Sequence, residues 1–260
     1  MNKTGIIIQA RMASTRLPNK IMLDLCGKPL LWHVVERCKR ADIDEVIIAT
    51  STNKENDIIE EFCEKNNYKC FRGSEDDVLN RYYKAAKKFK LDIIVRVTSD
   101  CPLIAPEIIN RAIDGLKKGN GDYVSNASIR SYPRGLDVEV FTFDVLEKAH
   151  KLTKDKFQRE HVTAFIYNNP QMFKIGSLIV KGLLKKPDIR ICVDTKEDFE
   201  LLKIIYNKFY NCEIIPIMKV MTFLNKNPEL AKMNIESEKE HLEKSKDLKQ
   251  KFIDKNGRKF

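Results

Sequence analysis

The first half of the chain alternates short apolar runs with longer segments in which apolar residues recur every three or four positions. The short runs are rich in Val and Ile, which is typical of buried β-strands. The longer segments have the period of amphipathic helices. This pattern predicts strands at residues 5–10, 45–50, 68–72 and 92–98, and helices at residues 30–38, 57–66, 76–90 and 106–118.

Strands that alternate with helices of this length are typical of βαβ units, which build a mostly parallel sheet. The predicted fold class is therefore α/β, Rossmann-like, with helices on both faces of the sheet. The alternation is less regular beyond Gly121. There the pattern predicts strands at residues 137–143, 173–180 and 188–193, and helices at residues 156–167 and 195–209, the last with Thr195 as its N-cap.

From residue 227 the chain is dense in Lys and Glu and poor in large apolar residues. We therefore expect residues 1–226 to form the folded domain. Residues 227–260 are expected to be a solvated terminal helix or a frayed tail that the chemistry does not need.

Composition narrows the class of protein. In 260 residues, 43% are hydrophobic, which is enough for a substantial core, and no apolar stretch approaches the roughly 20 residues of a membrane span. Seven cysteines without a CxxC pair suggest reduced thiols, so we expect a cytoplasmic protein. The net charge of +10 raises the question of nucleic acid. Because the lysines are interleaved with acids and no nucleic-acid-binding motif occurs, no such partner is predicted.

The loop after the first predicted strand is rich in cations. It contains Arg11, Arg16 and Lys20, together with the hydroxyls of Ser14 and Thr15. Ligands of open α/β sheets bind outside the carboxyl ends of the strands, and these groups are donors that a polyphosphate accepts. The loop has neither GxxxxGK[ST] nor GxGxxG, so side chains would do most of the binding. The alternative is a solvated basic loop.

Two aspartates also follow predicted strands. Asp100 comes after the strand at residues 92–98, and Asp194 comes after the strand at residues 188–193. Mg²⁺ typically takes one or two carboxylates together with phosphate oxygens of a substrate, so the two strand ends could hold one Mg²⁺. The alternative makes both aspartates turn or helix-capping residues.

These motifs carry a resemblance to a known family. They read IIIQARMASTRLPNKIMLDLCGKPLLWHVVERC, FRGSEDDVLNRYYKAA, IVRVTSDCPLI, PRGLDVEVF, REHVT and RICVDTKEDFELL. In this order they resemble the cytidylyltransferases of the spore-coat-polysaccharide type, relatives of the synthetases that make CMP-Kdo and CMP-sialic-type acids. The resemblance covers about residues 5–225, and the tail lies outside it.

The resemblance implies a nucleotide-diphospho-sugar transferase fold, which residues 1–226 would form. It also implies a Mg²⁺-dependent enzyme that moves CMP from CTP to a sugar acid or related polysaccharide precursor and releases pyrophosphate. Two alternatives stay open: transfer to a sugar phosphate or alditol phosphate, and a non-catalytic nucleotide-binding module. A homodimer is expected, with residues 173–180 as its contact.

The resemblance also implies roles for individual residues. The nucleotide would be bound by Ala10, Arg11, Ser14, Arg16, Lys20, Arg72, Asp77 and Thr98. Catalysis would depend on Arg11, Arg16, Lys20 and Asp100, and Mg²⁺ would be held by Asp100 and Asp194. Two positions depart from the family pattern: Asn19 stands where Gly is usual, and Arg134 stands where an acid is common.

The acceptor is expected to meet the middle of the chain. Asp137 and Glu139 alternate with apolar residues, so they share one face of a strand and could bind sugar hydroxyls. The alternative has both facing solvent on an edge strand. Arg159 and His161 lie near a predicted helix start, where His161 could contact a carboxylate or phosphate, although a lone His is often structural.

Overall fold

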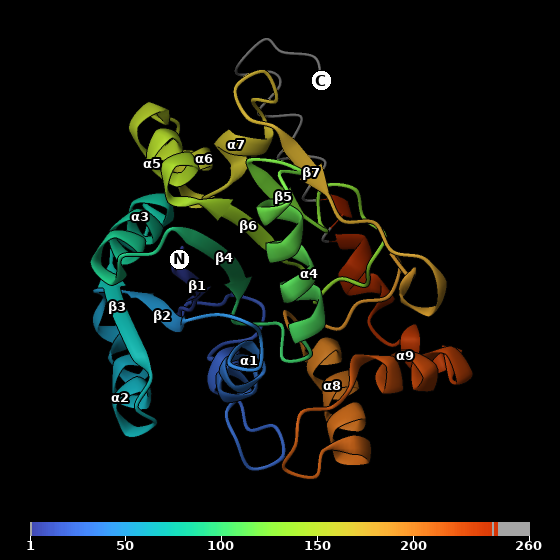
Figure 1. The fold of residues 1–260 in the computed structure, drawn as a ribbon. Coiled ribbons are helices and arrows are strands. Elements are labelled where there is room, and N and C mark those ends of the chain that lie inside the picture. Colours follow the sequence, from blue (N-terminus) through green and yellow to red (C-terminus); the bar gives the residue numbers. More distant parts are fainter. Residues whose placement is uncertain (1, 241, 244–260) are drawn as a thin grey trace.

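A seven-stranded sheet forms the centre of the molecule (Figure 1). The computed structural model describes residues 2–240 and 242–243. The strands follow the order β3-β2-β1-β4-β6-β5-β7 across the sheet. They are β1 (Thr4–Gln9), β2 (Glu45–Ser51), β3 (Lys69–Gly73), β4 (Ile93–Thr98), β5 (Tyr123–Ser125), β6 (Glu139–Thr142) and β7 (Ile175–Ser177). Only β6 runs antiparallel to its neighbours β4 and β5.

Helices cover both faces of this sheet (Figure 1). They are α1 (Leu30–Cys38), α2 (Asp57–Lys65), α3 (Val78–Phe89), α4 (Pro106–Lys117), α5 (Phe143–Leu152), α6 (Lys156–Glu160), α7 (Ala164–Tyr167), α8 (Lys196–Phe209), α9 (Ile217–Lys226) and α10 (Pro228–Ala231). Because side chains alternate along a strand, Ile6 and Ile8 of β1 pack with α1, α4 and α8, whereas Ile7 packs with α3 and α5. The α/β prediction is confirmed.

The second half of the chain differs from the prediction in several elements. The helix expected at residues 156–167 is divided into α6 and α7, because Val162 has a positive φ of 57° that interrupts the helix. Residues 188–193 do not form a strand, and Arg190 makes only an isolated bridge with Arg134. The pattern also missed β5, α5 and α9. The expected N-cap of α8 is present: Thr195 forms a capping box with Asp198.

Part of the C-terminal segment is buried. The side chains of Asn234, Ser237 and Glu238 lie against the main domain. The expectation of a solvated tail is therefore wrong at these three positions, because polar side chains can be buried when they find charged partners. Residues 241 and 244–260 of the predicted tail lie outside the described residues.

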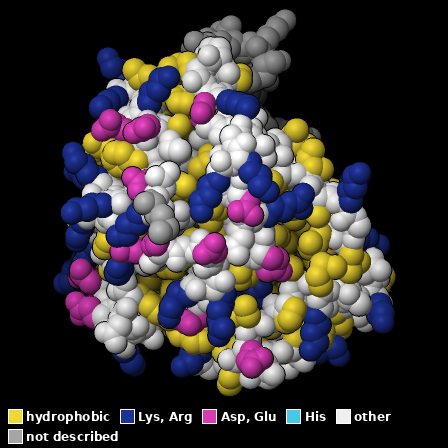
Figure 2. Space-filling view, in the orientation of Figure 1, with side chains coloured by type: hydrophobic (Ala, Val, Ile, Leu, Met, Phe, Trp, Pro, Cys, Tyr) yellow, Lys and Arg dark blue, Asp and Glu magenta, His cyan; other side chains and the backbone are white. Residues whose placement is uncertain are grey.

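The face of the molecule drawn in Figure 2 has Lys and Arg side chains interleaved with acidic and apolar ones, and not gathered in one patch. Within the part of the chain that the structure describes, no helix has the length and apolarity to span a membrane. All seven cysteines are free thiols.

Candidate active site

A cleft opens at the carboxyl ends of β1 and β4. Its volume is about 340 Å³, larger than a second cavity of about 60 Å³ beside Trp32 and Tyr210. Nine residues predicted from the sequence line the cleft, namely Ala10, Arg11, Ser14, Arg16, Lys20, Thr98, Asp100, His161 and Asp194. Segments separated by more than 170 residues therefore meet where α/β sheets bind ligands.

Lys20 lies at the centre of the charged part of the cleft. Its Nζ donates hydrogen bonds to Asp100 Oδ2 at 2.9 Å, to Asp194 Oδ1 at 2.7 Å and to the carbonyl oxygen of Val193 at 2.8 Å. The backbone helps to place it: Asn19 has a φ of 57°, and Lys20 begins a short 3₁₀ helix, Lys20–Met22. Asn tolerates this left-handed conformation, so the departure from Gly is accommodated.

Electrostatics keep all three groups charged. Burial would lower the pKa of Lys20, but Asp100 and Asp194 raise it overall above its ordinary value. Burial would raise the pKa of both aspartates, yet the Lys20 charge lowers it overall below the ordinary value. The two carboxylates and the ammonium are therefore ionised at neutral pH.

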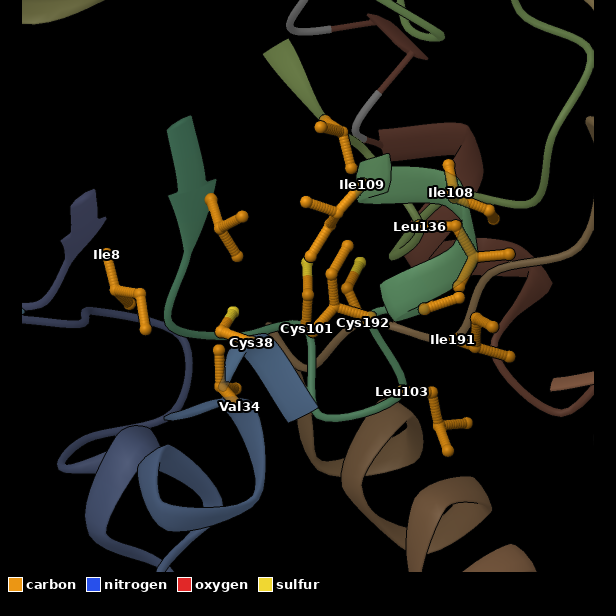
Figure 3. Packing of buried hydrophobic residues seen from close by; sticks show 14 of the residues in the cluster. Ile8, Val34, Cys38, Cys101, Leu103, Ile108, Ile109, Leu136, Ile191 and Cys192 are labelled. Atoms are coloured by element: carbon orange, nitrogen blue, oxygen red, sulfur yellow. The ribbon is translucent and has the colours of Figure 1, made fainter. Parts of the chain in front are cut away.

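The core explains why Asp100 and Asp194 come together. Each is next to or near a buried cysteine, Cys101 and Cys192, in one apolar cluster (Figure 3). The amide of Val193 also donates a hydrogen bond to the carbonyl oxygen of Asp100, at 2.8 Å. Buried apolar neighbours and one backbone hydrogen bond thus fix the two acidic residues side by side.

Asp194 is shared among several cations. Its Oδ1 lies 3.2 Å from the Arg16 guanidinium, in addition to Lys20. Its Oδ2 accepts a hydrogen bond from Arg190, which is buried behind the cleft. Three positive side chains from two segments, the loop after β1 and the stretch before α8, therefore converge on one carboxylate.

Two arginines of the cleft were missed by the sequence reasoning. Arg96 pairs with Glu139 and donates to Gln9 Oε1. Arg81 is buried, donates to the carbonyl oxygen of Ser74 at 2.6 Å, and has no hydrogen-bond partner for Nε among the described residues. The available signal was position: Arg96 interrupts the apolar run of β4, and Arg81 follows Val78 by three residues on the buried face of α3.

The other five predicted residues, Arg72, Asp77, Asp137, Glu139 and Arg159, do not line the cleft. Arg72 pairs with Asp57 and Glu60, at 2.6 Å each. Asp77 caps α3 and pairs with Arg159, at 2.7 Å. The nucleotide and acceptor roles of Arg72, Asp77 and Arg159 stay predictions, and the contacts in the structure tie these side chains to neighbouring elements.

The predicted acceptor acids are also held by protein partners. Asp137 lies 2.8 Å from Arg130. Glu139 accepts hydrogen bonds from Arg96, Tyr123 and Thr163. Because β6 lies between β4 and β5, Glu139 is buried, and the alternative of a solvent-facing edge strand is wrong for it. Its role in acceptor binding stays a prediction.

The donor set of the cleft can be tested for Mg²⁺. Asp100 and Asp194 each place an oxygen within 2.9 Å of Lys20 Nζ, so both carboxylates converge on one positive group. Within the described residues, no cluster of three or more His, Cys, Asp and Glu side chains could hold a metal ion. Two carboxylates fit Mg²⁺, which completes its shell with waters and phosphate oxygens.

An α/β sheet with a cation-rich loop at its carboxyl edge, facing two converging aspartates, is the arrangement of an enzyme that acts on phosphate groups. The cytidylyltransferase family model matches residues 5–260, and the chain belongs to this family of nucleotidyltransferases. The match includes residues 227–260, which we expected to lie outside the resemblance.

Individual relatives agree with this assignment. An uncharacterized protein of Methanocaldococcus jannaschii is 44% identical over 88% of this chain and 93% of its own. The spore coat polysaccharide biosynthesis protein SpsF of Bacillus subtilis is 35% identical over 89% and 98%. The structure of a cytidylyltransferase from Leptospira borgpetersenii has a TM-score of 0.83 at 35% identity, covering 89% of this chain and 97% of that one.

Proposed function

We propose that this enzyme transfers CMP from CTP to a sugar acid or related polysaccharide precursor, with Mg²⁺, and releases pyrophosphate. The observation that carries the proposal is the pair Asp100 and Asp194, converging on Lys20 beneath a cation-rich loop. The name of the Bacillus subtilis relative supports a polysaccharide precursor as the acceptor class.

The chemistry requires positioning and charge compensation more than covalent catalysis. An acceptor oxygen attacks the α-phosphorus of CTP, a new P–O bond forms, and the bond to pyrophosphate breaks. Negative charge accumulates on the leaving pyrophosphate. Arg11, Arg16 and Lys20 line the cleft where they would offset this charge. When bound between Asp100 and Asp194, Mg²⁺ would supply Lewis-acid polarisation of the phosphate oxygens.

The acceptor would bind in the same cleft. His161 lines the cleft, and its pKa lies below the ordinary value because burial and the nearby Arg96 and Arg11 charges disfavour the imidazolium. A neutral imidazole can donate one hydrogen bond to an acceptor oxygen. Arg81 and Arg96 also line the cleft and could pair with an anionic acceptor.

Pyrophosphate release from CTP, UTP, ATP and GTP tests the proposal, with Mg²⁺ and a panel of sugar acids, sugar phosphates and alditol phosphates. A site built to bind the cytosine amino group leaves buried polar atoms unpaired with uracil, so we expect CTP to exceed UTP by at least about a hundredfold in kcat/KM. Equal rates with UTP, or a preference for a purine, would contradict cytidylyl transfer. Turnover with a sugar phosphate alone would contradict the sugar-acid acceptor.

A further inference from the structure

Residues 227–240 contact the back of the cleft through one buried arginine. The Glu238 carboxylate accepts a hydrogen bond from Arg190 at 3.3 Å and from Arg134 at 2.8 Å. Arg190 also donates to Asp194 and, at 2.9 Å, to Asp198. Glu238 is thus one arginine away from a carboxylate of the proposed cation site.

This group of side chains is shielded from water. Arg190 is 1% exposed and Asp198 is fully buried, and only 9% of the Glu238 side chain is exposed. Charges in such surroundings interact strongly, and removing one partner leaves another uncompensated. Arg190 pairs with Asp194, Asp198 and Glu238. Loss of one of these ion pairs therefore changes how strongly Arg190 interacts with the other two carboxylates.

The backbone explains why Glu238 faces two arginines. Arg134 and Arg190 form an isolated parallel bridge, with hydrogen bonds from Arg134 N to Ile189 O at 2.9 Å and from Ile191 N to Arg134 O at 2.8 Å. Their side chains consequently leave neighbouring backbone positions. Glu238 is the carboxylate that pairs with both of these arginines.

Further hydrogen bonds fix the same segment in place. Asn234 Nδ2 donates to the carbonyl oxygen of Arg190 at 3.1 Å and to Asp198 Oδ1 at 2.7 Å. The hydroxyls of Ser237 and Thr195 lie 2.8 Å apart. All of these partners belong to the stretch around Asp194, so the C-terminal segment docks on the loop that carries that residue.

We propose that Glu238 is a positioning residue for the divalent-cation site: it takes up part of the Arg190 charge and so leaves Asp194 available as a metal ligand. The proposal rests on the proposed function, which makes Asp194 that ligand. Without Glu238, Arg190 would pair more fully with Asp194, and the local charge would become more positive. Both effects weaken the binding of a cation.

Binding of Mn²⁺ to the whole protein, followed by electron paramagnetic resonance without nucleotide, tests this proposal. Loss of a charged hydrogen bond predicts that Glu238→Gln weakens Mn²⁺ affinity about tenfold. Glu236→Gln is the matched control, because Glu236 is on the same segment but is exposed and pairs with Lys239. The control should stay within about twofold of the wild type, since exposed ion pairs contribute little.

A second variant separates positioning from folding. Arg134→Met frees Glu238 to pair with Arg190 alone and removes a positive charge, so Mn²⁺ affinity should rise. A purely structural role predicts a fall in both variants. Thermal melting shows whether each variant is folded, and Arg134→Met gives the answer even where Glu238→Gln does not fold.

The outcomes are distinct. Weaker Mn²⁺ binding by Glu238→Gln and tighter binding by Arg134→Met support the proposal. A wild type that binds Mn²⁺, with Glu238→Gln unchanged or Arg134→Met weakened, overturns the proposal and leaves the proposed function standing. A wild type that binds no Mn²⁺ overturns the metal assignment and the positioning role together.

Discussion

Lys20 connects the cation-rich loop after β1 to two aspartates, one at the end of β4 and one just before α8. It is the shared hydrogen-bond donor of Asp100 and Asp194, and the pKa values of all three groups show that they stabilise one another as ions. The sequence identified all three residues as candidates, because Lys20 lies in the cation-rich loop after β1, Asp100 follows β4 and Asp194 precedes the N-cap of α8. The convergence of the three on one point was not, since 174 positions separate Lys20 from Asp194.

Replacing Lys20 should therefore have opposite effects on turnover and on the binding of a divalent cation. In Lys20→Met, we expect the turnover of CTP to fall by about 10²–10³-fold, because the variant lacks the charge that we propose stabilises the leaving group. Mn²⁺ binding without nucleotide should become tighter, because the two carboxylates lose their cation. Arg40→Ala, an exposed charge just after α1, is the control. Weaker Mn²⁺ binding in Lys20→Met would contradict this account of the site.

The aspartates themselves give a complementary prediction. Asp100→Asn and Asp194→Asn keep the shape of each side chain but remove its charge, so each should abolish metal-dependent pyrophosphate release while the protein stays folded. Circular dichroism and thermal melting check the fold, and the pyrophosphate assay checks turnover. Near-normal turnover in either variant would remove that residue from the list of ligands.

At the scale of elements, short sequence patterns predicted the helices and strands that are determined by local interactions. The strands β1 to β4 and the capping box of α8 follow from short stretches of sequence. The stretch at residues 188–193 looked like a strand because of its apolar alternation, yet it pairs only through Arg190 and Arg134. The position of this stretch depends on the close approach of its backbone to Gly135. No pattern within residues 188–193 indicates that contact.

Gly135 lets the backbone of residues 191 and 192 pass against its Cα. It has a φ of +103°, and a Cβ there would lie 2.7 Å from the amide nitrogen of Cys192 and from the carbonyl carbon of Ile191. Gly135→Ala should therefore destabilise the protein by clearly more than the roughly 1–2 kcal/mol of a left-handed residue alone. It should also weaken Mn²⁺ binding, because the displaced backbone leads to Asp194.

Gly27→Ala separates the cost of a positive φ from the cost of a steric clash. Gly27 has a φ of +81°, but a Cβ there would meet nothing within 4 Å. This variant measures the backbone cost without the steric one. Denaturant unfolding of the two variants gives the comparison, and equal losses of unfolding free energy would contradict the close approach at Gly135.

Across the whole molecule, the sequence predicted the architecture better than the long-range contacts of polar side chains. Apolar alternation identified the sheet because the core obeys a simple pattern. The many Lys and Glu side chains beyond residue 227 suggested a solvated tail, because the sequence around a Glu or an Asn does not show whether a distant side chain pairs with it. Glu238 finds Arg190 across 48 positions, and only the folded chain brings them together.

Ion pairs of Glu139, Asp100 and Asp194 make the stability of the fold depend on pH. Burial would raise the pKa of Glu139, but the Arg96 charge and hydrogen bonds from Tyr123 and Thr163 lower it overall below the ordinary value. The pKa values of Asp100 and Asp194 are lowered as well. As pH falls, the carboxyl groups of the unfolded chain bind protons first, because their pKa values are about 4 and those of the folded protein are lower. These three groups therefore stabilise the fold above about pH 4, and this contribution is lost as the pH falls further.

Glu139→Gln should remove one part of this dependence. At neutral pH the variant should be less stable than the wild type by about 3 kcal/mol, because Arg96, which is largely buried, loses its carboxylate partner. The difference should shrink as pH falls below about 4, where Glu139 of the unfolded wild-type chain takes up a proton before Glu139 of the folded protein does. Urea unfolding of both proteins between neutral and acidic pH measures it, with the exposed Glu61→Gln as control. A difference that stays constant with pH would mean that the Glu139 charge does not stabilise the folded state.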